Sequence, residues 1–426
     1  MNTDILIAGT GCSGLYCALN LPENKKITVI TKSDAESNDS FLAQGGICVL
    51  KNDDDFDAFF EDTLRAGHYE NDRTSVKIMI EESQDVINDL VKIGVDFAKN
   101  EDGSFNYTKE GAHSTDRILF HKDITGKEIT SKLLQEAKKR SNIEILEYTT
   151  LLDIIVSDNC CVGAILSTCD GEIVAVEAEY TILATGGIGG LFEHSTNFPH
   201  LTGDSLAIAI KHGIELKDID YIQIHPTTLY TEEKNDRSFL ISESVRGEGA
   251  KLYDKNMTRF TNELLPRDLL TEEIYKQMKK DNTKHVWEDL TVIPRKELRE
   301  HFPNIVAHCK EKGYDAENEC IPIVPAQHYF MGGIKVNHNS KTSMDGLYAV
   351  GETACNGVHG RNRLASNSLL ESLVFAKKAA LEICANPKTK KTLHDIDLSV
   401  YKDRENLEEE YRNSVLQKIK EKKENV

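Results

Sequence analysis

The residues best suited to chemistry lie in the segment 359–369, which reads HGRNRLASNSL. Its Arg363 offers a planar, two-pronged donor of the kind that binds a carboxylate. The segment follows a short apolar run that ends in a turn at Glu352. It precedes an apolar stretch without glycine or proline, 369–384, which predicts a helix. The free N–H groups at the start of such a helix suit a reduced flavin beside an anionic substrate; a basic loop before an ordinary helix cap is the alternative.

The start of the chain shows a glycine pattern typical of nucleotide binding. An apolar run at 4–8 leads into Gly9, Gly11 and Gly14, and a helical pattern follows. In this Gly-x-Gly-x-x-Gly turn the glycines allow a tight turn, close approach of a pyrophosphate, and close packing of helix on strand. The next predicted strand ends at Lys32, where nicotinamide-dependent dehydrogenases carry an acidic residue that holds a ribose. The pattern therefore predicts a dinucleotide site and argues against a plain nicotinamide-dependent dehydrogenase.

Length, charge and cysteine spacing exclude several classes of protein. The chain has 426 residues, enough for two or three domains, and its formal net charge of −19 argues against nucleic acid or an anionic membrane as partner. Neither an apolar run long enough to span a membrane nor a signal peptide is apparent. The ten cysteines show no C-x-x-C pair and no zinc or iron–sulfur spacing, which favours reduced thiols, a cytoplasmic location and no metal site.

The periodicity of the sequence predicts a cofactor domain interrupted by a second domain. Amphipathic helices are predicted at 75–93 and 129–141, and the acidic stretch 52–62 predicts the first turn of a helix rather than a calcium loop. From about 218 to 329 prolines and charges become more frequent, which indicates an inserted capping domain. A group of predicted strands, interpreted as a β-meander, comprises 143–147, 151–156, 161–167 and 173–177.

Five motifs follow one another along the chain: the glycine turn at 9–14, Ala-Gln-Gly-Gly at 43–46, Ala-Thr-Gly-Gly at 184–187, Gly351-Glu352 and the Arg363 segment. Together they resemble the succinate dehydrogenase/fumarate reductase flavoprotein superfamily and, within it, the L-aspartate oxidases, over residues 3–385. Respiratory members attach FAD through a histidine four residues before the Ala-Gln-Gly-Gly run. Asp39 occupies that position here, so the resemblance implies non-covalent FAD.

The resemblance implies an α/β fold in which a Rossmann-like FAD-binding domain carries an inserted α+β capping domain. The FAD-binding domain would comprise 1–217 and 330–390, and the capping domain 218–329. Residues 391–426 would form a short, truncated C-terminal helical segment, where many L-aspartate oxidases continue into a longer helical domain. The residues expected to hold FAD are Gly9, Thr10, Gly11, Cys12, Ser13, Gly14, Lys32, Ser40, Phe41, Leu42, Ala43, Gln44, Gly45, Gly46, Asp204, Glu352, Ser368 and Leu369.

The resemblance also assigns residues to the substrate. His225, His328 and Arg363 would hold its carboxylates, with Thr227 beside them, and Glu110 stands where L-aspartate oxidases carry a glutamate near the substrate amino group. A carboxylate attracts an ammonium group and repels a dicarboxylate that lacks one. A solvent-exposed loop glutamate is the alternative interpretation of Glu110.

Proton transfer is assigned by the resemblance alone. Arg267 would transfer the proton, with Glu243 and Arg246 as its relay to solvent. The residues themselves do not predict this role, because a guanidinium group rarely gives up a proton in a protein.

The expected reaction is oxidation of L-aspartate to iminosuccinate (iminoaspartate), with O2 or fumarate as electron acceptor. This is the first step of NAD biosynthesis through quinolinate, so quinolinate synthase is the expected downstream enzyme. A soluble fumarate reductase or succinate dehydrogenase flavoprotein is the nearest alternative, and Asp39 and Glu110 disfavour it. A non-catalytic flavin-binding subunit is a further alternative, but it would be expected to lack some of the histidines and arginines named above.

Overall fold

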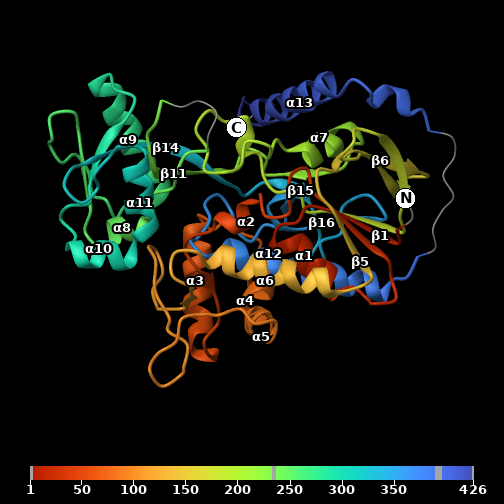
Figure 1. Ribbon diagram of the computed structural model, residues 1–426, viewed down its shortest axis with the longest axis horizontal. Coiled ribbons are helices and arrows are strands. Elements are labelled where there is room, and N and C mark those ends of the chain that lie inside the picture. The colour runs from red at the N-terminus through yellow and green to blue at the C-terminus, as the bar shows by residue number, and fades with distance from the viewer. Residues whose placement is uncertain (1–2, 233–236, 389–395, 425–426) are drawn as a thin grey trace.

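The structure, a computed structural model, describes residues 3–232, 237–388 and 396–424. Its centre is a parallel sheet with the strand order β16–β9–β1–β2–β5 (Figure 1). Four of these strands are short and fully buried because other layers cover the sheet on both faces, whereas the edge strand β5 exposes Glu144. Their bounds are β1 (Ile5–Ala8), β2 (Ile27–Ile30), β5 (Ile143–Leu146), β9 (Tyr180–Leu183) and β16 (Leu347–Ala349).

Alternate residues of β1 face two different layers. Ile5 and Ile7 pack in one hydrophobic cluster, and Leu6 and Ala8 pack in another, as the two-residue period of a strand requires. The first cluster includes helices α1 (Cys12–Asn20), α6 (Thr125–Lys139) and α12 (Asn367–Ala385). The second includes strands β6 (Thr150–Ser157), β7 (Cys160–Ser167) and β8 (Ile173–Glu177) and helix α7 (Asp204–Lys211).

The strand predicted at 143–147 does not belong to the meander. β5 pairs in parallel with β2, from Ile27 opposite Ile143 to Ile30 opposite Leu146. The antiparallel meander consists of β6, β7 and β8. The predicted grouping was wrong because the sequence of a short apolar strand does not indicate which strand it pairs with. The grouping therefore rested on proximity in sequence alone.

Shorter elements lie beneath the helical face of the sheet (Figure 1). The acidic stretch forms a 3-10 turn (Asp53–Asp55) that leads into α3, as predicted. The single helix predicted at 75–93 is interrupted, because the Ser83 hydroxyl donates to the Ile80 carbonyl (2.6 Å) and accepts from the Leu50 N–H (3.0 Å). The elements of this layer are α2 (Asp39–Leu42), α3 (Phe56–Ala66), α4 (Arg73–Glu81), α5 (Ser83–Lys92), β3 (Ile47–Cys48) and β4 (Ile118–Leu119).

The capping region is built on an antiparallel sheet with the order β11–β14–β13–β12, at the left of Figure 1. Its strands are β11 (Ile222–Leu229), β12 (Lys251–Tyr253), β13 (Val286–Asp289) and β14 (Ile321–Phe330). Helices α8 (Glu243–Gly247), α9 (Arg267–Asp281), α10 (Arg295–His301) and α11 (Pro303–Glu311) surround it and share its own hydrophobic core. The predicted fold class is confirmed. The domain boundaries stay a prediction, and the one at 390 lies outside the described residues.

A small sheet and the C-terminal helix complete the described chain. The sheet has the order β10 (Leu216–Lys217), β15 (Gly333–Lys335) and β17 (Ala354–Cys355), and 3-10 turns occur at Gly189–Leu191, Gly351–Thr353 and Leu398–Tyr401. Helix α13 (Arg404–Glu424) lies along α7 (Figure 1) and buries Val415 and Ile419.

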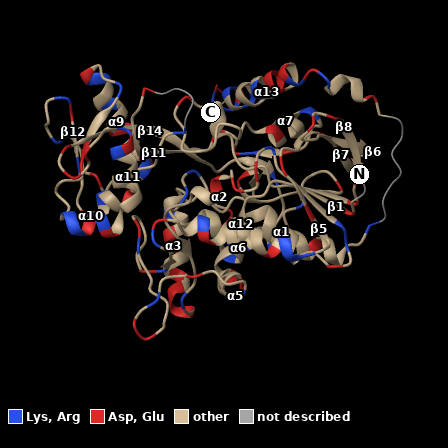
Figure 2. Ribbon diagram, viewed as in Figure 1, with Lys and Arg blue, Asp and Glu red and all other residues tan. Residues whose placement is uncertain are grey.

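Charged residues lie mainly on the outer helices and loops, whereas the central strands carry few of them and are mainly tan (Figure 2). Within the described ranges, no helix is both long and apolar enough to cross a bilayer.

The glycine turn brings β1 and α1 into direct contact. Gly9 has a φ of +124°, and a Cβ atom there would lie 2.0 Å from the carbonyl oxygen of Ala184, the residue that follows β9. A Cβ atom on Gly14 would lie 2.1 Å from the carbonyl oxygen of Gly9. The sequence pattern therefore reflects two steric requirements of the turn.

We expect Gly14→Ala to lower the free energy of unfolding by about 1–3 kcal/mol or more, because the added methyl group overpacks a rigid backbone contact. Denaturant titration of the variant measures this change. Gly247→Ala is the matched control, since a Cβ atom there meets nothing within 4 Å. Equal stability of the two variants would contradict the packing argument.

Candidate active site

A cavity extends from the carboxyl ends of β1 and β2 to the capping region. Ligands of open α/β sheets bind at this edge. At one end lie the glycine turn and Lys32, whose Nζ is 2.9 Å from Asp204 Oδ2. At the other end, side chains of β11, β14 and α9 line the same space as Arg363. One elongated site thus brings together the two groups of residues that the sequence assigned to cofactor and substrate.

The glycine turn ends at the N-terminus of α1. Gly11 is the N-cap residue and offers no side chain to the free N–H groups, although the Cys12 N–H donates to Ser40 Oγ at 3.1 Å. Backbone N–H groups and helix dipole favour an anion at this point. The end of the cavity therefore suits a pyrophosphate.

Buried polar atoms on the cavity wall have no hydrogen-bond partner among the described residues. They are Thr10 Oγ1, Asp39 Oδ2, Gln44 Oε1 and Asn197 Oδ1. Buried polar groups are normally satisfied, so this wall is complementary to a ligand rich in hydroxyl, phosphate and amide groups. FAD, with its ribose, ribityl chain, pyrophosphate and flavin ring, fits that requirement.

The residues predicted to hold FAD fall into two groups. Those that line the cavity are Gly9, Thr10, Gly11, Cys12, Ser13, Lys32, Ser40, Leu42, Ala43, Gln44, Gly45, Gly46, Asp204, Glu352, Ser368 and Leu369. Gly14 and Phe41 are not part of the lining; Gly14 instead allows α1 to approach the turn. The contacts of all these residues with FAD stay a prediction.

Carboxyl groups near the predicted flavin region are held partly neutral. Burial raises the pKa of Asp39 to about 7, and that of Glu352 to about 8 with a further contribution from the charge of Asp39. Asp39 Oδ1 accepts from the Phe198 N–H (3.0 Å), and Glu352 Oε1 accepts from the Phe330 N–H (2.9 Å). Asp39 therefore stands at the linking position as a backbone-bonded carboxyl group, a poor candidate for a covalent flavin bond.

Arg363 and Arg267 meet at one amide oxygen. Gln223 Oε1 accepts from Arg267 Nη1 (3.1 Å) and from Arg363 Nε (3.3 Å). Arg363 also donates to Ser368 Oγ (2.7 Å), and its guanidinium group lies 4.4 Å from the Tyr329 ring centroid. Burial, together with the charge of Arg267, lowers the pKa of Arg363 to about 10. Two adjacent guanidinium groups on a buried wall are complementary to a dianion.

His225 and His328 project from neighbouring strands and lie edge to face, 5.3 Å between ring centroids. Burial, followed by the charges of nearby arginines, lowers the pKa of both imidazoles well below the usual value. They are therefore neutral hydrogen-bonding groups at the cavity. Thr227 is not part of the lining; its hydroxyl donates to the Ile241 carbonyl at 3.0 Å.

The predicted proton relay is partly assembled. Arg267 Nε donates to Glu243 Oε2 at 2.7 Å. Burial alone would raise the pKa of Glu243, but the charges of Arg267 and Arg246 outweigh it and hold the pKa below its usual value. Arg246 lies behind the cavity wall, is 2% exposed, and donates to the Glu263 carbonyl at 2.6 Å. Its guanidinium group thus does not itself reach solvent.

Glu110 is half-buried in the cavity wall, on a loop between α5 and β4. Its Oε2 accepts from the Ser366 hydroxyl at 2.5 Å, and burial raises its pKa. A Cβ atom on Gly45 would lie 2.6 Å from Glu110 Oε1, so a side chain there would push against the end of the Glu110 side chain. Ser366 is the N-cap residue of α12, but its hydroxyl binds this carboxylate and caps no N–H group of the helix.

Sequence reasoning missed Gln223, although a signal was present. Gln223 precedes His225 by two residues, so a strand places both on one face. It also missed Arg237, which lines the cavity from a charged loop without a recognisable motif. Arg361 lies outside the lining and is paired with Glu70, so of the two neighbouring arginines only Arg363 lines the cavity.

This fold and this site define an FAD-dependent flavoprotein of the succinate dehydrogenase/fumarate reductase type. A family model for the FAD binding domain matches residues 4–369. A quinol-fumarate reductase structure superimposes with a TM-score of 0.87 at 29% identity, covering 99% of this chain and 76% of that one.

Curated relatives narrow the family. An L-aspartate oxidase from Clostridium perfringens is 52% identical over 380 residues, which cover 89% of this chain and 86% of the relative. An L-aspartate oxidase from Bacillus subtilis is 40% identical over 393 residues, covering 90% and 72%. The chain belongs to the L-aspartate oxidase family.

We expect FAD to be bound without a covalent link, because Asp39 replaces the linking histidine. After acid precipitation of the yellow holoprotein, the colour should remain in the supernatant. Flavin that stays in the washed pellet would contradict this expectation.

Arg363→Leu should weaken binding of a dicarboxylate such as succinate at least tenfold while FAD stays bound. Losing a charged hydrogen-bonding partner typically costs about 1.5–3 kcal/mol. Perturbation of the flavin absorbance by succinate measures the affinity. Arg361→Leu is the matched control and should bind succinate as the wild type does. Equal affinities of the two variants would show that Arg363 does not hold the ligand.

Proposed function

We propose that this protein oxidises L-aspartate to iminoaspartate with FAD as cofactor and O2 or fumarate as electron acceptor, the first step of NAD biosynthesis. One observation carries the proposal: Glu110 lines the same cavity as Arg363 and Arg267. The arginines match the two carboxylates of the substrate, and Glu110 matches its ammonium group. An amino dicarboxylate is complementary to this arrangement of charges.

The residues position and polarise the substrate. Arg363 forms the main carboxylate contact, and the neutral imidazoles of His225 and His328 add hydrogen bonds. FAD, when bound, supplies the two-electron acceptor for the hydride of the α-carbon. Burial of the wall excludes water and strengthens each of these electrostatic contacts.

The amino group loses a proton as the carbon–nitrogen double bond forms. In the proposal Glu110 orients the amino group, and Arg267 with Glu243 holds the proton-transfer position, at 2.7 Å from one another. The role of Arg267 follows from the family resemblance. The hydrogen bond to Glu243 fixes the orientation of the Arg267 guanidinium group, and the lowered pKa of Glu243 keeps that partner charged.

Iminoaspartate hydrolyses in water, so we propose that the next enzyme, quinolinate synthase, consumes it rapidly. A cytoplasmic location is also part of the proposal. The cysteines of the described ranges are free, in keeping with a reducing compartment.

A soluble fumarate reductase is the alternative, since the TM-score of 0.87 shows that this scaffold also serves that chemistry. The test is turnover of the FAD-loaded protein with L-aspartate or succinate, first under air and then without oxygen but with fumarate. Oxidation of L-aspartate under either condition supports the proposal. Turnover of succinate alone would replace it by the alternative.

Glu110→Gln should lower the apparent affinity for L-aspartate by roughly one to two orders of magnitude, because it removes the charge that faces the ammonium group. The affinity for succinate should hold or improve, since a repulsive charge is lost. Titrations of both ligands, followed through flavin absorbance, measure the effect. Glu101→Gln, on the exposed part of the same loop, is the matched control. Equal weakening of both ligands would remove the amine-specific role.

The pH dependence gives a second readout of the same variant. The pKa of Glu110 is raised by burial, so the carboxylate is charged above that pKa and neutral below it. The KM for L-aspartate should therefore rise as the pH falls through this range. In Glu110→Gln the corresponding rise should be missing, whereas an identical rise would assign it to another group.

A further inference from the structure

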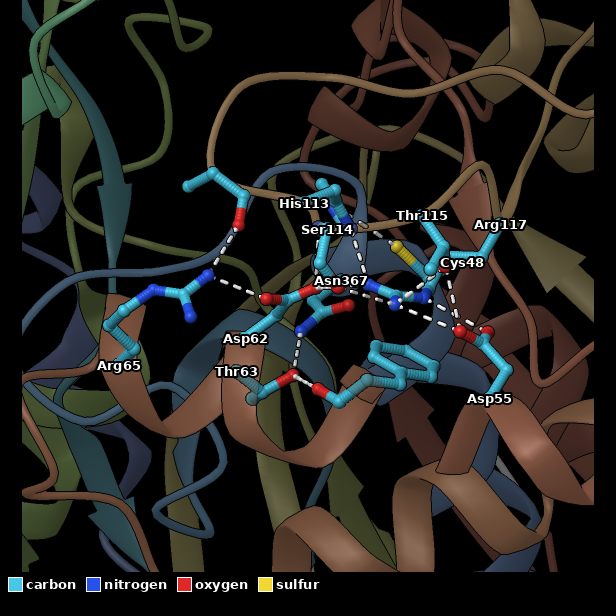
Figure 3. Close-up of polar contacts among 12 residues, drawn as sticks. Cys48, Asp55, Asp62, Thr63, Arg65, His113, Ser114, Thr115, Arg117 and Asn367 are labelled. Atoms are coloured by element: carbon cyan, nitrogen blue, oxygen red, sulfur yellow. Dashed lines mark hydrogen bonds and ion pairs between the residues drawn. The ribbon is translucent and has the colours of Figure 1, made fainter. Parts of the chain in front are cut away.

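A buried ion-pair cluster lies directly beneath the loop that carries Glu110 (Figure 3). Arg117 is 0% exposed and forms a two-pronged pair with Asp55, at 3.0 and 3.1 Å, and a further pair with Asp62 at 2.7 Å. Arg65 donates to the second oxygen of Asp62 at 2.5 Å, which completes the charge balance. Buried ion pairs of this kind add little net stability but fix geometry, since each lost partner leaves an unpaired charge.

The cluster anchors the second half of the loop to α3 and the preceding turn. The Ser114 N–H and hydroxyl both donate to Asp62 Oδ2 at 2.7 Å, and the Thr115 hydroxyl donates to Asp55 Oδ1 at 2.7 Å. Arg65 also donates to the Ala112 carbonyl at 3.1 Å (Figure 3). The loop thus leaves the cluster in a defined direction, only a few residues from Glu110.

His113 connects the cluster to the substrate segment. Arg117 Nη1 lies 3.1 Å from His113 Nδ1, and a guanidinium group can only donate, so Nδ1 is the acceptor. The proton of the neutral ring is therefore on Nε2, which donates to the Ala365 carbonyl at 3.0 Å. Burial, with the charge of Arg117 acting in the same direction, lowers the pKa of His113 to about 4, so the ring stays neutral near pH 7.

Ala365 belongs to the segment that carries both Arg363 and Ser366. It follows Arg363 by two residues and precedes Ser366, whose hydroxyl binds Glu110. Ser366 has a φ of +60°, a strained conformation for a residue with a side chain, so the surrounding contacts must hold it. The His113 bond to Ala365 is one of these contacts, and it also joins the Glu110 loop to the segment that carries Arg363.

Arg363 and Glu110 depend on this bond to different degrees. Arg363 has its own contacts with Gln223, Ser368 and Tyr329. The side chain of Glu110 accepts from the Ser366 hydroxyl, on the segment that the His113–Ala365 hydrogen bond attaches to the loop. Loss of the His113–Ala365 hydrogen bond should therefore displace Glu110 and leave Arg363 in place.

We propose that His113 is a positioning residue that fixes Glu110 in the cavity that Arg363 also lines, and thereby determines the preference for an amino dicarboxylate over a plain dicarboxylate. This inference rests on the proposed function. Arg117, Asp55 and Asp62 act through His113 by selecting the tautomer that donates to Ala365.

Two substitutions of similar size separate this role from a general effect on stability. His113→Gln places an amide N–H near the former Nε2 and can still reach Ala365. His113→Asn keeps an acceptor for Arg117 near the former Nδ1 but is too short for Ala365. We expect His113→Asn to raise the KM for L-aspartate about five- to tenfold, the scale of one lost hydrogen bond, with kcat within about threefold. His113→Gln should restore most of the loss.

The inhibition constant of succinate should change little in either variant, so the ratio of the two affinities is the decisive readout. In the background of Glu110→Gln, His113→Asn should have almost no further effect on the KM, because the group that it positions has lost its charge. His121→Leu is the matched control: His121 bonds to the Asp96 carbonyl (2.5 Å), outside the cavity lining, and its loss should leave the KM unchanged.

The outcomes separate the two proposals. Additive effects of the Glu110 and His113 substitutions, or equal losses for L-aspartate and succinate, would overturn the role of His113 while the function stands. A lowered melting temperature with an unchanged affinity ratio would do the same. A wild-type protein that does not oxidise L-aspartate would overturn the proposed function itself, and with it this inference.

Discussion

The site depends on how buried positive charge is balanced. Arg363 and Arg267 share the oxygen of Gln223 on a wall with little access to water. Such a pair is costly to bury without an anion, and Glu243 balances one of the two charges through its 2.7 Å bond to Arg267. Arg363 keeps no comparable carboxylate partner among the described contacts. The charge that remains is available to an anion in the cavity, and in the proposed function a substrate carboxylate completes the balance.

The rest of the fold serves to bring this wall against the cofactor region. The parallel sheet places the glycine turn at its carboxyl edge, and α12 returns from the far end of the chain so that Ser368 and Leu369 line the same cavity. β11 and β14 extend from this edge into the capping sheet and carry the two histidines. Because their imidazoles are neutral, the positive charge of the site comes from guanidinium groups and is insensitive to pH near neutrality.

Local features could be predicted from the sequence, and features that depend on distant partners could not. The glycine turn is encoded within six residues, and the strands around it are continuous apolar runs. The partner of β5 and the break before Ser83 depend on contacts that the local pattern does not contain. The link from Arg117 through His113 to Ala365 joins residues about 250 positions apart, so the sequence could only give His113 as an ordinary structural histidine.

Specificity in this family can then be understood as a difference between two affinities on one scaffold. Fumarate, which names the superimposed reductase, carries two carboxylates and no amine. Adding one carboxylate to the loop favours an ammonium-bearing ligand and disfavours the others, but only if that carboxylate is held at a fixed place. A mobile Glu110 would swing toward Arg363 or Arg267 and cancel the charge that binds the substrate. The buried pairs beneath the loop, and the Ser366 hydroxyl at its tip, keep the negative charge apart from the positive charges. On the proposed role of Glu110, the selectivity of the site depends as much on the rigidity of this loop as on the presence of a glutamate.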